Sequence, residues 1–246
     1  MSFTKIQAHR GASGYAPENT MAAFKKAIDM KADGIELDVH LSKDGHLIVM
    51  HDEYLNRTSN GKGLIASYTL EELKKLDAGS WFEKEFKGEK IPTLHEVLEF
   101  IFKTEIFINI EIKAGYRIYP NIEEKVLACL QKYNMLDRCI ISSFDHYSLV
   151  RVKELNPNVK TGLLYSASLY EPWKYAKSVK VNALHPLYLT LDKHFIEEAY
   201  AHNLDINTYT VNDEKVMRQL AAARISGIIT NYPDKAKKIL SEIREG

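Results

Sequence analysis

The sequence lacks an excess of charge of either sign. Its 246 residues include 33 lysines and arginines and 33 aspartates and glutamates, so the formal net charge is zero. Proteins that bind nucleic acids normally carry a basic excess, which argues against such a partner here. With 45% hydrophobic and 27% charged residues, the chain has the composition of a globular protein and not of a disordered or fibrous one.

Cysteines are scarce and long apolar runs are missing. Cys129 and Cys139 lie next to apolar residues, so we expect two buried free thiols and no disulfide framework. No apolar stretch reaches the roughly 18 residues that span a membrane, and we therefore expect no membrane anchor. Residues 1–5 do not form a basic region followed by an apolar run, so no secretory signal is expected and the cytoplasm is the expected location.

Short β-type segments alternate with amphipathic helical segments. Eight strands are predicted, at residues 6–9, 34–40, 107–112, 139–144, 160–164, 183–186, 205–210 and 227–230. Helices are predicted around 21–28, after the capping residues Thr93 and Asp145, and at 122–133, 172–178, 192–202, 213–223 and 234–243. This alternation favours a (β/α)₈ TIM barrel over an open doubly wound sheet, and Gly11 and Gly14 do not complete a dinucleotide-binding fingerprint.

One segment interrupts the alternation. Asp44-Gly45 is a strong signal for a two-residue hairpin loop, which predicts an extra strand at residues 47–50. Residues 53–89 then fit no repeat of strand and helix, and we interpret them as an insertion beside the barrel mouth. No linker or internal repeat is evident, so residues 1–246 are predicted to form a single barrel domain.

Charged residues lie near the carboxyl ends of two predicted strands. Alternate residues of a strand share a face, so Glu36 and Asp38 point to one side, and Asn109, Glu111 and Lys113 share a side of their own strand. Active sites of TIM barrels lie at this end of the strands. The pattern therefore predicts a charged cluster inside the barrel near its mouth.

Three carboxylates in this position need compensation. Helices cover the strands of a barrel, so solvent cannot surround the charges, and uncompensated carboxylates would repel one another or take up protons. Lys113 can offset one of the three charges. Because hard carboxylate oxygens suit Mg²⁺ or Ca²⁺, we expect a bound divalent cation.

The hairpin also predicts the position of His51. A two-residue loop places Asp38 opposite His51, and directly opposite residues share a face of the sheet. A shift of one residue would turn His51 away and bring Met50 into the site instead. With His9 at the end of the first strand, the hairpin register gives two imidazoles beside the carboxylates.

These residue types suit chemistry at a phosphate. Arg10 and Lys113, together with a divalent cation, can hold an anionic phosphate, and two imidazoles can share general base and general acid work. The sequence has no nucleophilic serine motif and no P-loop. The constellation predicts phosphodiester cleavage. His185, at the end of the sixth strand, is a further substrate-side candidate, with a purely structural role as the alternative.

Several motifs together resemble the glycerophosphodiester phosphodiesterase family, nearly from end to end. They are His9-Arg10-Gly11, Pro17-Glu18-Asn19-Thr20, Gly34-Ile35-Glu36-Leu37-Asp38-Val39, His51-Asp52, Thr69-Leu70, Leu76-Asp77-Ala78-Gly79, Ile91-Pro92-Thr93-Leu94 and Glu111-Ile112-Lys113. The resemblance implies a (β/α)₈ barrel that hydrolyses glycerophosphodiesters to glycerol 3-phosphate and an alcohol. It implies that His9 and His51 are the catalytic pair and that Arg10 and Lys113 bind the phosphate. It also implies three metal ligands, Glu36, Asp38 and Glu111.

Two other functions stay open at this point. One is a lysophospholipase D-like activity on lipid substrates, against which the zero net charge and the missing anchor argue. The other is a barrel that only binds phosphoglycerol compounds, although a binding protein has no need of an acid–base pair. Tyr209 stands where members of the family often have Trp, which bears on the shape of the substrate pocket.

Overall fold

The protein is described by a computed structural model that covers residues 4–113 and 118–245. Within these residues, nine strands form one sheet in the order β1-β9-β8-β7-β6-β5-β4-β2-β3, and β1 also pairs with β2, which closes a barrel of eight parallel strands. The strands are β1 (Lys5–His9), β2 (Gly34–Leu41), β3 (Leu47–Val49), β4 (Phe107–Ile112), β5 (Cys139–Ser143), β6 (Lys160–Tyr165), β7 (Ala183–Pro186), β8 (Asp205–Thr208) and β9 (Gly227–Thr230). The predicted TIM barrel is confirmed, and every predicted strand end lies within two residues of the observed one.

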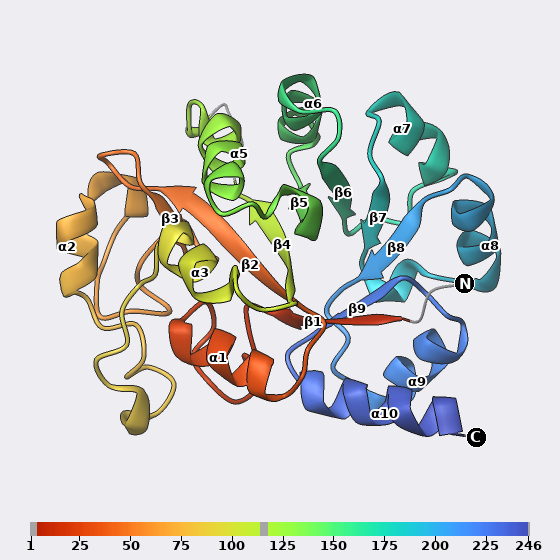
Figure 1. The fold of residues 1–246 in the computed structure, drawn as a ribbon, viewed down its shortest axis with the longest axis horizontal. Coiled ribbons are helices and arrows are strands. Elements are labelled where there is room, and N and C mark those ends of the chain that lie inside the picture. The colour runs from red at the N-terminus through yellow and green to blue at the C-terminus, as the bar shows by residue number, and fades with distance from the viewer. Residues whose placement is uncertain (1–3, 114–117, 246) are drawn as a thin grey trace.

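Helices surround the barrel (Figure 1). They are α1 (Met21–Asp29), α2 (Leu70–Lys75), α3 (Leu94–Ile101), α5 (Ile122–Lys132), α6 (His146–Leu155), α7 (Pro172–Ser178), α8 (Lys193–Ala201), α9 (Glu214–Ala222) and α10 (Pro233–Glu245). Thr93 and Glu96 form the predicted capping box of α3, and the Asp145 side chain caps α6. Among the described residues, no helix has both the length and the apolar character needed to cross a membrane.

The main core lies between the strands and these helices. On β2, Ile35, Leu37 and Val39 are fully buried and belong to the same apolar cluster as Phe24 of α1 and Leu98 of α3. The alternate residues of β2 are therefore left to face the barrel interior. This division of faces is what allows charged side chains to occupy a strand that is buried along its whole length.

The predicted insertion forms a small unit of its own. Residues 53–89 contain α2 and two short 3-10 turns, and in Figure 1 this segment lies beside β3 at one end of the molecule. Leu55, Ile65 and Leu73 are fully buried in a separate apolar cluster that also includes Ile48 of β3 and Met50. The cluster fixes the insertion to the hairpin that extends from the barrel.

The predicted hairpin register is wrong by one residue. The observed pairs are Val39 with Val49 and Leu41 with Leu47, which puts Asp38 opposite Met50. A two-residue type I′ loop requires positive φ at both loop positions, but only Gly45 of the Asp44-Gly45 pair has it, at +80°. The Ser42 N–H donates to the His46 carbonyl, so the loop has three residues instead of two.

Candidate active site

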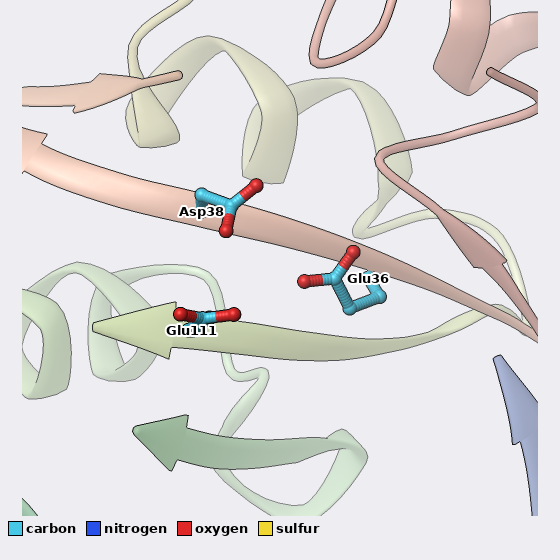
Figure 2. Close-up of side chains that lie close together, drawn as sticks. All are labelled: Glu36, Asp38 and Glu111. Carbon is cyan, nitrogen blue, oxygen red and sulfur yellow. The ribbon is translucent and has the colours of Figure 1, made fainter. Parts of the chain in front are cut away.

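The acidic residues predicted inside the barrel do lie together. Neighbouring strands β2 and β4 pair Glu36 with Asn109 and Asp38 with Glu111. A carboxylate oxygen from each of Glu36, Asp38 and Glu111 lies within 4.8 Å of the others, and all three residues are buried. Figure 2 shows these carboxyl groups side by side across the two strands. The alternation of polar and apolar residues was thus a sound guide to which side chains face the interior.

Two cations lie against this acidic triad. The Lys113 ammonium is 2.6 Å from Glu111 Oε1 and 3.5 Å from Asp38 Oδ1. Arg10 Nε lies 3.4 Å from Asp38 Oδ2, and the Arg10 backbone N–H donates to Glu36 Oε2 at 2.9 Å. Arg10 therefore contributes charge that the sequence argument, which considered Lys113 alone, left out.

The triad nevertheless keeps a surplus of negative charge. Burial and the adjacent carboxylates of Asp38 and Glu111 raise the pKa of Glu36 well above its usual range, and burial together with Asp38 raises the pKa of Glu111 to about 7. Burial would also raise the pKa of Asp38, but Lys113 and Arg10 lower it to about 2. Two of the three acids thus favour the protonated form, and one stays ionised. This is expected of a carboxylate cluster that lacks enough positive charge to balance it.

The donor set fits a hard divalent cation. It consists of three carboxylates, and Asp38 Oδ1 is buried without accepting a hydrogen bond from the described residues. An oxygen in this state has an unused coordination position, and oxygen ligands of this kind are those that Mg²⁺ and Ca²⁺ prefer. Glu36, Asp38 and Glu111 are thus suited to hold the cation that the sequence predicts.

The turn after β1 brings Arg10 to the triad. Arg10 and Gly11 have φ values of +55° and +80°, so two successive residues adopt left-handed backbone conformations. A non-glycine residue there carries a cost of about 1–3 kcal/mol, which its surroundings must offset. The bond from the Arg10 N–H to Glu36 and the bond from the Asn19 N–H to the Arg10 carbonyl do so. At Gly11 a Cβ would lie 2.7 Å from Ala23, which explains the glycine.

His9 ends β1 and lines the site pocket. Its Nδ1 lies 2.6 Å from Asn231 Oδ1, and because an amide oxygen only accepts, Nδ1 carries the hydrogen. Burial and the neighbouring Arg10 lower the pKa of His9 to about 4. The ring is therefore neutral near pH 7, with a free lone pair on Nε2.

His51 also lines the pocket, although the register that was used to predict this is wrong. Strand β3 ends at Val49, so His51 lies beyond the ladder and its side chain is no longer bound to the alternation of a strand. Its Nδ1 lies 2.7 Å from Asp52 Oδ1. Met50, which the one-residue shift was expected to bring into the site, packs in the apolar cluster of the insertion instead.

The site pocket has a volume of about 200 Å³ and two unlike walls. One wall carries the charged and titratable residues His9, Arg10, Glu36, His51 and Glu111. The other comes from β5, β6 and β9 and from the residues that follow β5 and β8, and it includes Phe144, Leu164 and Tyr209. The Tyr209 hydroxyl donates to the Tyr165 carbonyl, which fixes the ring at the pocket wall.

His185 does not lie on this pocket. It is fully buried on β7, where its Nε2 lies 3.0 Å from Asn207 Nδ2, and the Asn207 Oδ1 accepts from Gln7. Burial lowers the pKa of His185 to about 3, so the ring is neutral. These contacts favour the structural role that the sequence left as the alternative.

Sequence reasoning assigned no role to several residues that support the site. Asn19 donates from Nδ2 to Asp38 Oδ2 at 2.8 Å, and Asn231 holds His9. Asn231 directly follows β9, so the rule that sites lie at strand ends could have found it. Arg57 had no such signal, because its position depends on the path of the insertion.

Comparison with known proteins agrees with the motifs. The sequence profile described as "Glycerophosphoryl diester phosphodiesterase family" matches residues 9–235. The chain belongs to this family. The resemblance and the prediction of an enzyme of this family are therefore confirmed. The chain is 46% identical to a glycerophosphodiester phosphodiesterase of Caldanaerobacter subterraneus over 99% of both chains, and 42% identical to one of Bacillus subtilis, covering 94% of this chain and 85% of that one.

Solved structures agree as well. A phosphodiesterase of Oleispira antarctica, solved in complex with the product sn-glycerol-3-phosphate, superposes with a TM-score of 0.92 at 32% identity over 97% of both chains. A glycerophosphodiester phosphodiesterase of Agrobacterium tumefaciens gives a TM-score of 0.86 at 30% identity, over 96% of this chain and all of the other. The fold and the family are thus established by sequence and by structure.

Proposed function

We propose that the protein hydrolyses glycerophosphodiesters to glycerol 3-phosphate and an alcohol, with a divalent cation, Mg²⁺ or Ca²⁺, held by Glu36, Asp38 and Glu111. The observation that carries this proposal is a single pocket lined by both imidazoles, Arg10, Glu36 and Glu111. Asp38 and Lys113 lie directly against these residues without lining the pocket themselves. The product complex of the Oleispira antarctica relative supports the substrate class. When bound, the cation would neutralise charge on the phosphate and polarise it for attack.

The basic side chains would bind the phosphate. Arg10 lines the pocket, and Lys113 lies next to it against Glu111. Their side chains are 17% and 18% exposed, so neither is closed off from a ligand. Burial would lower the pKa of each, but the nearby carboxylates, above all Asp38, raise it, which keeps both side chains charged. Charged donors of this kind suit the negative charge of a phosphodiester.

The two histidines differ in what holds them, and this suggests how they divide the work. His9 is bonded to the neutral amide of Asn231, whereas His51 is bonded to the carboxylate of Asp52. A carboxylate partner stabilises an imidazolium and an amide does so much less. Burial lowers the pKa of His51, while the Asp38 and Asp52 carboxylates favour its charged form. We assign proton acceptance to His9 Nε2 and proton donation to His51 Nε2, which carries a proton only in the imidazolium form.

The reaction then balances as follows. A hydroxyl of water, or of the substrate's own glycerol, attacks phosphorus while its proton passes to His9 Nε2. The bond from phosphorus to the oxygen of the departing alcohol breaks, and that oxygen takes the proton from His51 Nε2. If the glycerol hydroxyl attacks first, water opens the resulting cyclic phosphodiester with the two histidines in exchanged roles.

One assay tests the proposal against both alternatives. Purified protein is incubated with glycerophosphocholine, glycerophosphoethanolamine and lysophosphatidylcholine, with and without EDTA, and then with added Mg²⁺ or Ca²⁺. We expect glycerol 3-phosphate from the first two compounds, no turnover in EDTA, and recovery on addition of the cation. Preferred cleavage of the lysophospholipid would indicate the lipid-directed activity, and binding without turnover would indicate a binding protein. Full turnover in excess EDTA would contradict the cation site.

A further inference from the structure

His51 needs support that its strand does not give. The last backbone bond from this strand to β2 runs from the Met50 N–H to the Asp38 carbonyl, so the ladder stops one residue before His51. Two contacts replace it: His40 Nε2 lies 3.0 Å from the His51 carbonyl, and Asp52 Oδ1 lies 2.7 Å from His51 Nδ1. The first holds the backbone, while the second sets the orientation of the ring. The orientation of the ring therefore depends on the position of the Asp52 carboxylate.

Arg57 holds that carboxylate with both ends of its guanidinium. Its Nε and Nη2 donate to the two Asp52 oxygens at 2.7 and 2.9 Å. The remaining edge donates from Nη1 and Nη2 to the two oxygens of Glu18 at 2.8 and 2.7 Å. Paired donation to both oxygens of a carboxylate fixes its plane as well as its position.

Glu18 connects Arg57 to Arg10, the residue proposed to bind the phosphate. Its Oε1 also accepts from Arg10 Nη1 at 2.8 Å. The side chains thus form one continuous line, from His51 through Asp52, Arg57 and Glu18 to Arg10. Opposite charges alternate along it between Asp52 and Arg10, so each group is attracted to both neighbours.

We propose that Arg57 is a positioning residue, which holds His51 and Arg10 at a fixed separation through Asp52 and Glu18. The inference rests on the proposed roles of these two residues in the reaction. It also gives the insertion a function, because Arg57 links residues 53–89 to Asp52 and Glu18.

The insertion is able to serve as the fixed support. Leu55 and Thr58, on either side of Arg57, are 0% and 4% exposed. The Leu55 N–H donates to the Gly63 carbonyl, and the Ser59 hydroxyl donates to the Leu55 carbonyl. The backbone that carries Arg57 is therefore anchored on both sides, while its guanidinium bonds to Asp52 and Glu18.

The test compares Arg57→Ala and Arg57→Lys with a matched control, Arg151→Ala. Arg57 and Arg151 have side chains that are each 44% exposed, and both form ion pairs to carboxylates on other segments, but Arg151 pairs with Glu124 of α5 away from the pocket. We expect Arg57→Ala to lower kcat/KM about 10- to 100-fold, the range typical when an outer partner of a site residue is removed. Arg57→Lys should recover only part of this, since an ammonium cannot bind two carboxylates side by side. Arg151→Ala should keep normal kcat and KM.

Arg57 acts on His51 through Asp52 and on Arg10 through Glu18, and these two branches should affect kcat and KM differently. A general loss of folding would not separate the two kinetic constants in this way. Asp52→Asn releases His51 and should lower mainly kcat, whereas Glu18→Gln releases Arg10 and should raise mainly KM. Arg57→Ala should change both, and adding either branch substitution to it should cost less than the product of the single effects. In ¹⁵N NMR spectra, His51 Nδ1 should carry a hydrogen in both the charged and the neutral ring of the wild type, and the neutral ring should become a mixture of tautomers in Arg57→Ala.

Each outcome decides the matter. If His51→Ala abolishes turnover while Arg57→Ala behaves like Arg151→Ala, the positioning role is wrong and the proposed function stands. If Arg57→Ala loses activity with unchanged His51 tautomer and fully multiplicative double variants, Arg57 acts by another route and the inference is overturned. If His51→Ala itself keeps normal kcat, the proposed function fails first.

Discussion

The two sides of the barrel interior use buried polar residues in opposite ways. On the β2–β4 side, Glu36, Asp38 and Glu111 are buried as a cluster of like charges. On the β7–β8 side, His185 and Asn207 are just as deeply placed, but they are neutral and bonded to one another. Both sets occupy inward-facing strand positions of the same fold. Burial and strand position therefore do not distinguish functional from structural residues.

What distinguishes the two sides is charge, because each holds a buried polar atom without a hydrogen bond among the described residues: Asp38 Oδ1 on one side and His185 Nδ1 on the other. The neutral side is connected through Gln7 to Asn109 and Ser142, so its amides find partners inside the barrel. The acidic side instead has a surplus of negative charge and raised carboxyl pKa values. A buried cluster of like charges that its protein leaves uncompensated indicates a missing cation.

The largest expected effect contrasts one histidine from each side. His51→Ala should lower kcat on the order of 10²–10⁴-fold, because a proton-transfer group is lost, and should change the free energy of unfolding little. His185→Ala should instead keep kcat and KM but lose about 2–5 kcal/mol of stability, the usual cost of a large cavity in a core. Steady-state kinetics and urea unfolding of both variants make the comparison. A raised KM in His185→Ala would restore the substrate-side role that the sequence suggested.

The second prediction concerns Lys113, the lysine that contacts the acidic triad. Lys113→Ala removes a charged donor from the phosphate site, which should cost about 1.5–3 kcal/mol in kcat/KM, or about 10- to 100-fold. Its removal takes a positive charge from the triad, so cation binding measured by calorimetry should be no weaker. Lys193→Ala, whose side chain is 90% exposed, serves as the control. Unchanged kcat/KM in Lys113→Ala would remove this residue from the site.

The sequence was sufficient for the parts of this comparison that depend on strand alternation. The positions of Glu36, Asp38 and Glu111 follow from a period of two, which holds wherever one face of a strand is covered by helices. The position of His51 depends on a loop conformation in which Gly45, but not Asp44, adopts positive φ, and dipeptide preferences do not decide this. Arg57 lies further out of reach, since its contacts with Glu18 and Asp52 exist only after the insertion has folded back on the barrel.

A smaller effect is expected from crowding the neutral side. A Cβ added at Gly162 of β6 would lie 2.3 Å from His185 Nε2, closer than any stable contact. Gly162→Ala should therefore destabilise the protein by about 1–3 kcal/mol, as overpacked cores do, with kcat nearly unchanged. The combination with His185→Ala should cost less than the sum of the single variants, because the smaller side chain makes room for the new methyl group. Additive losses in urea unfolding would show that the two residues do not press on one another.

The smallest effect is a pH dependence of stability that belongs to His185. Burial lowers the pKa of His185 to about 3 from the ordinary 6.5, so the unfolded chain binds a proton that the folded chain does not. The stability from this residue is complete above pH 6.5 and is lost as pH falls towards the folded pKa, by at most about 1.4 kcal/mol per pH unit. Compared with the wild type, His185→Gln should show a flatter loss of unfolding free energy between pH 6.5 and 5.5, measured in urea with the cation present. An unchanged slope in His185→Gln would mean that the neutral side of the barrel admits a proton, and the contrast with the charged side would then be weaker than the buried contacts imply.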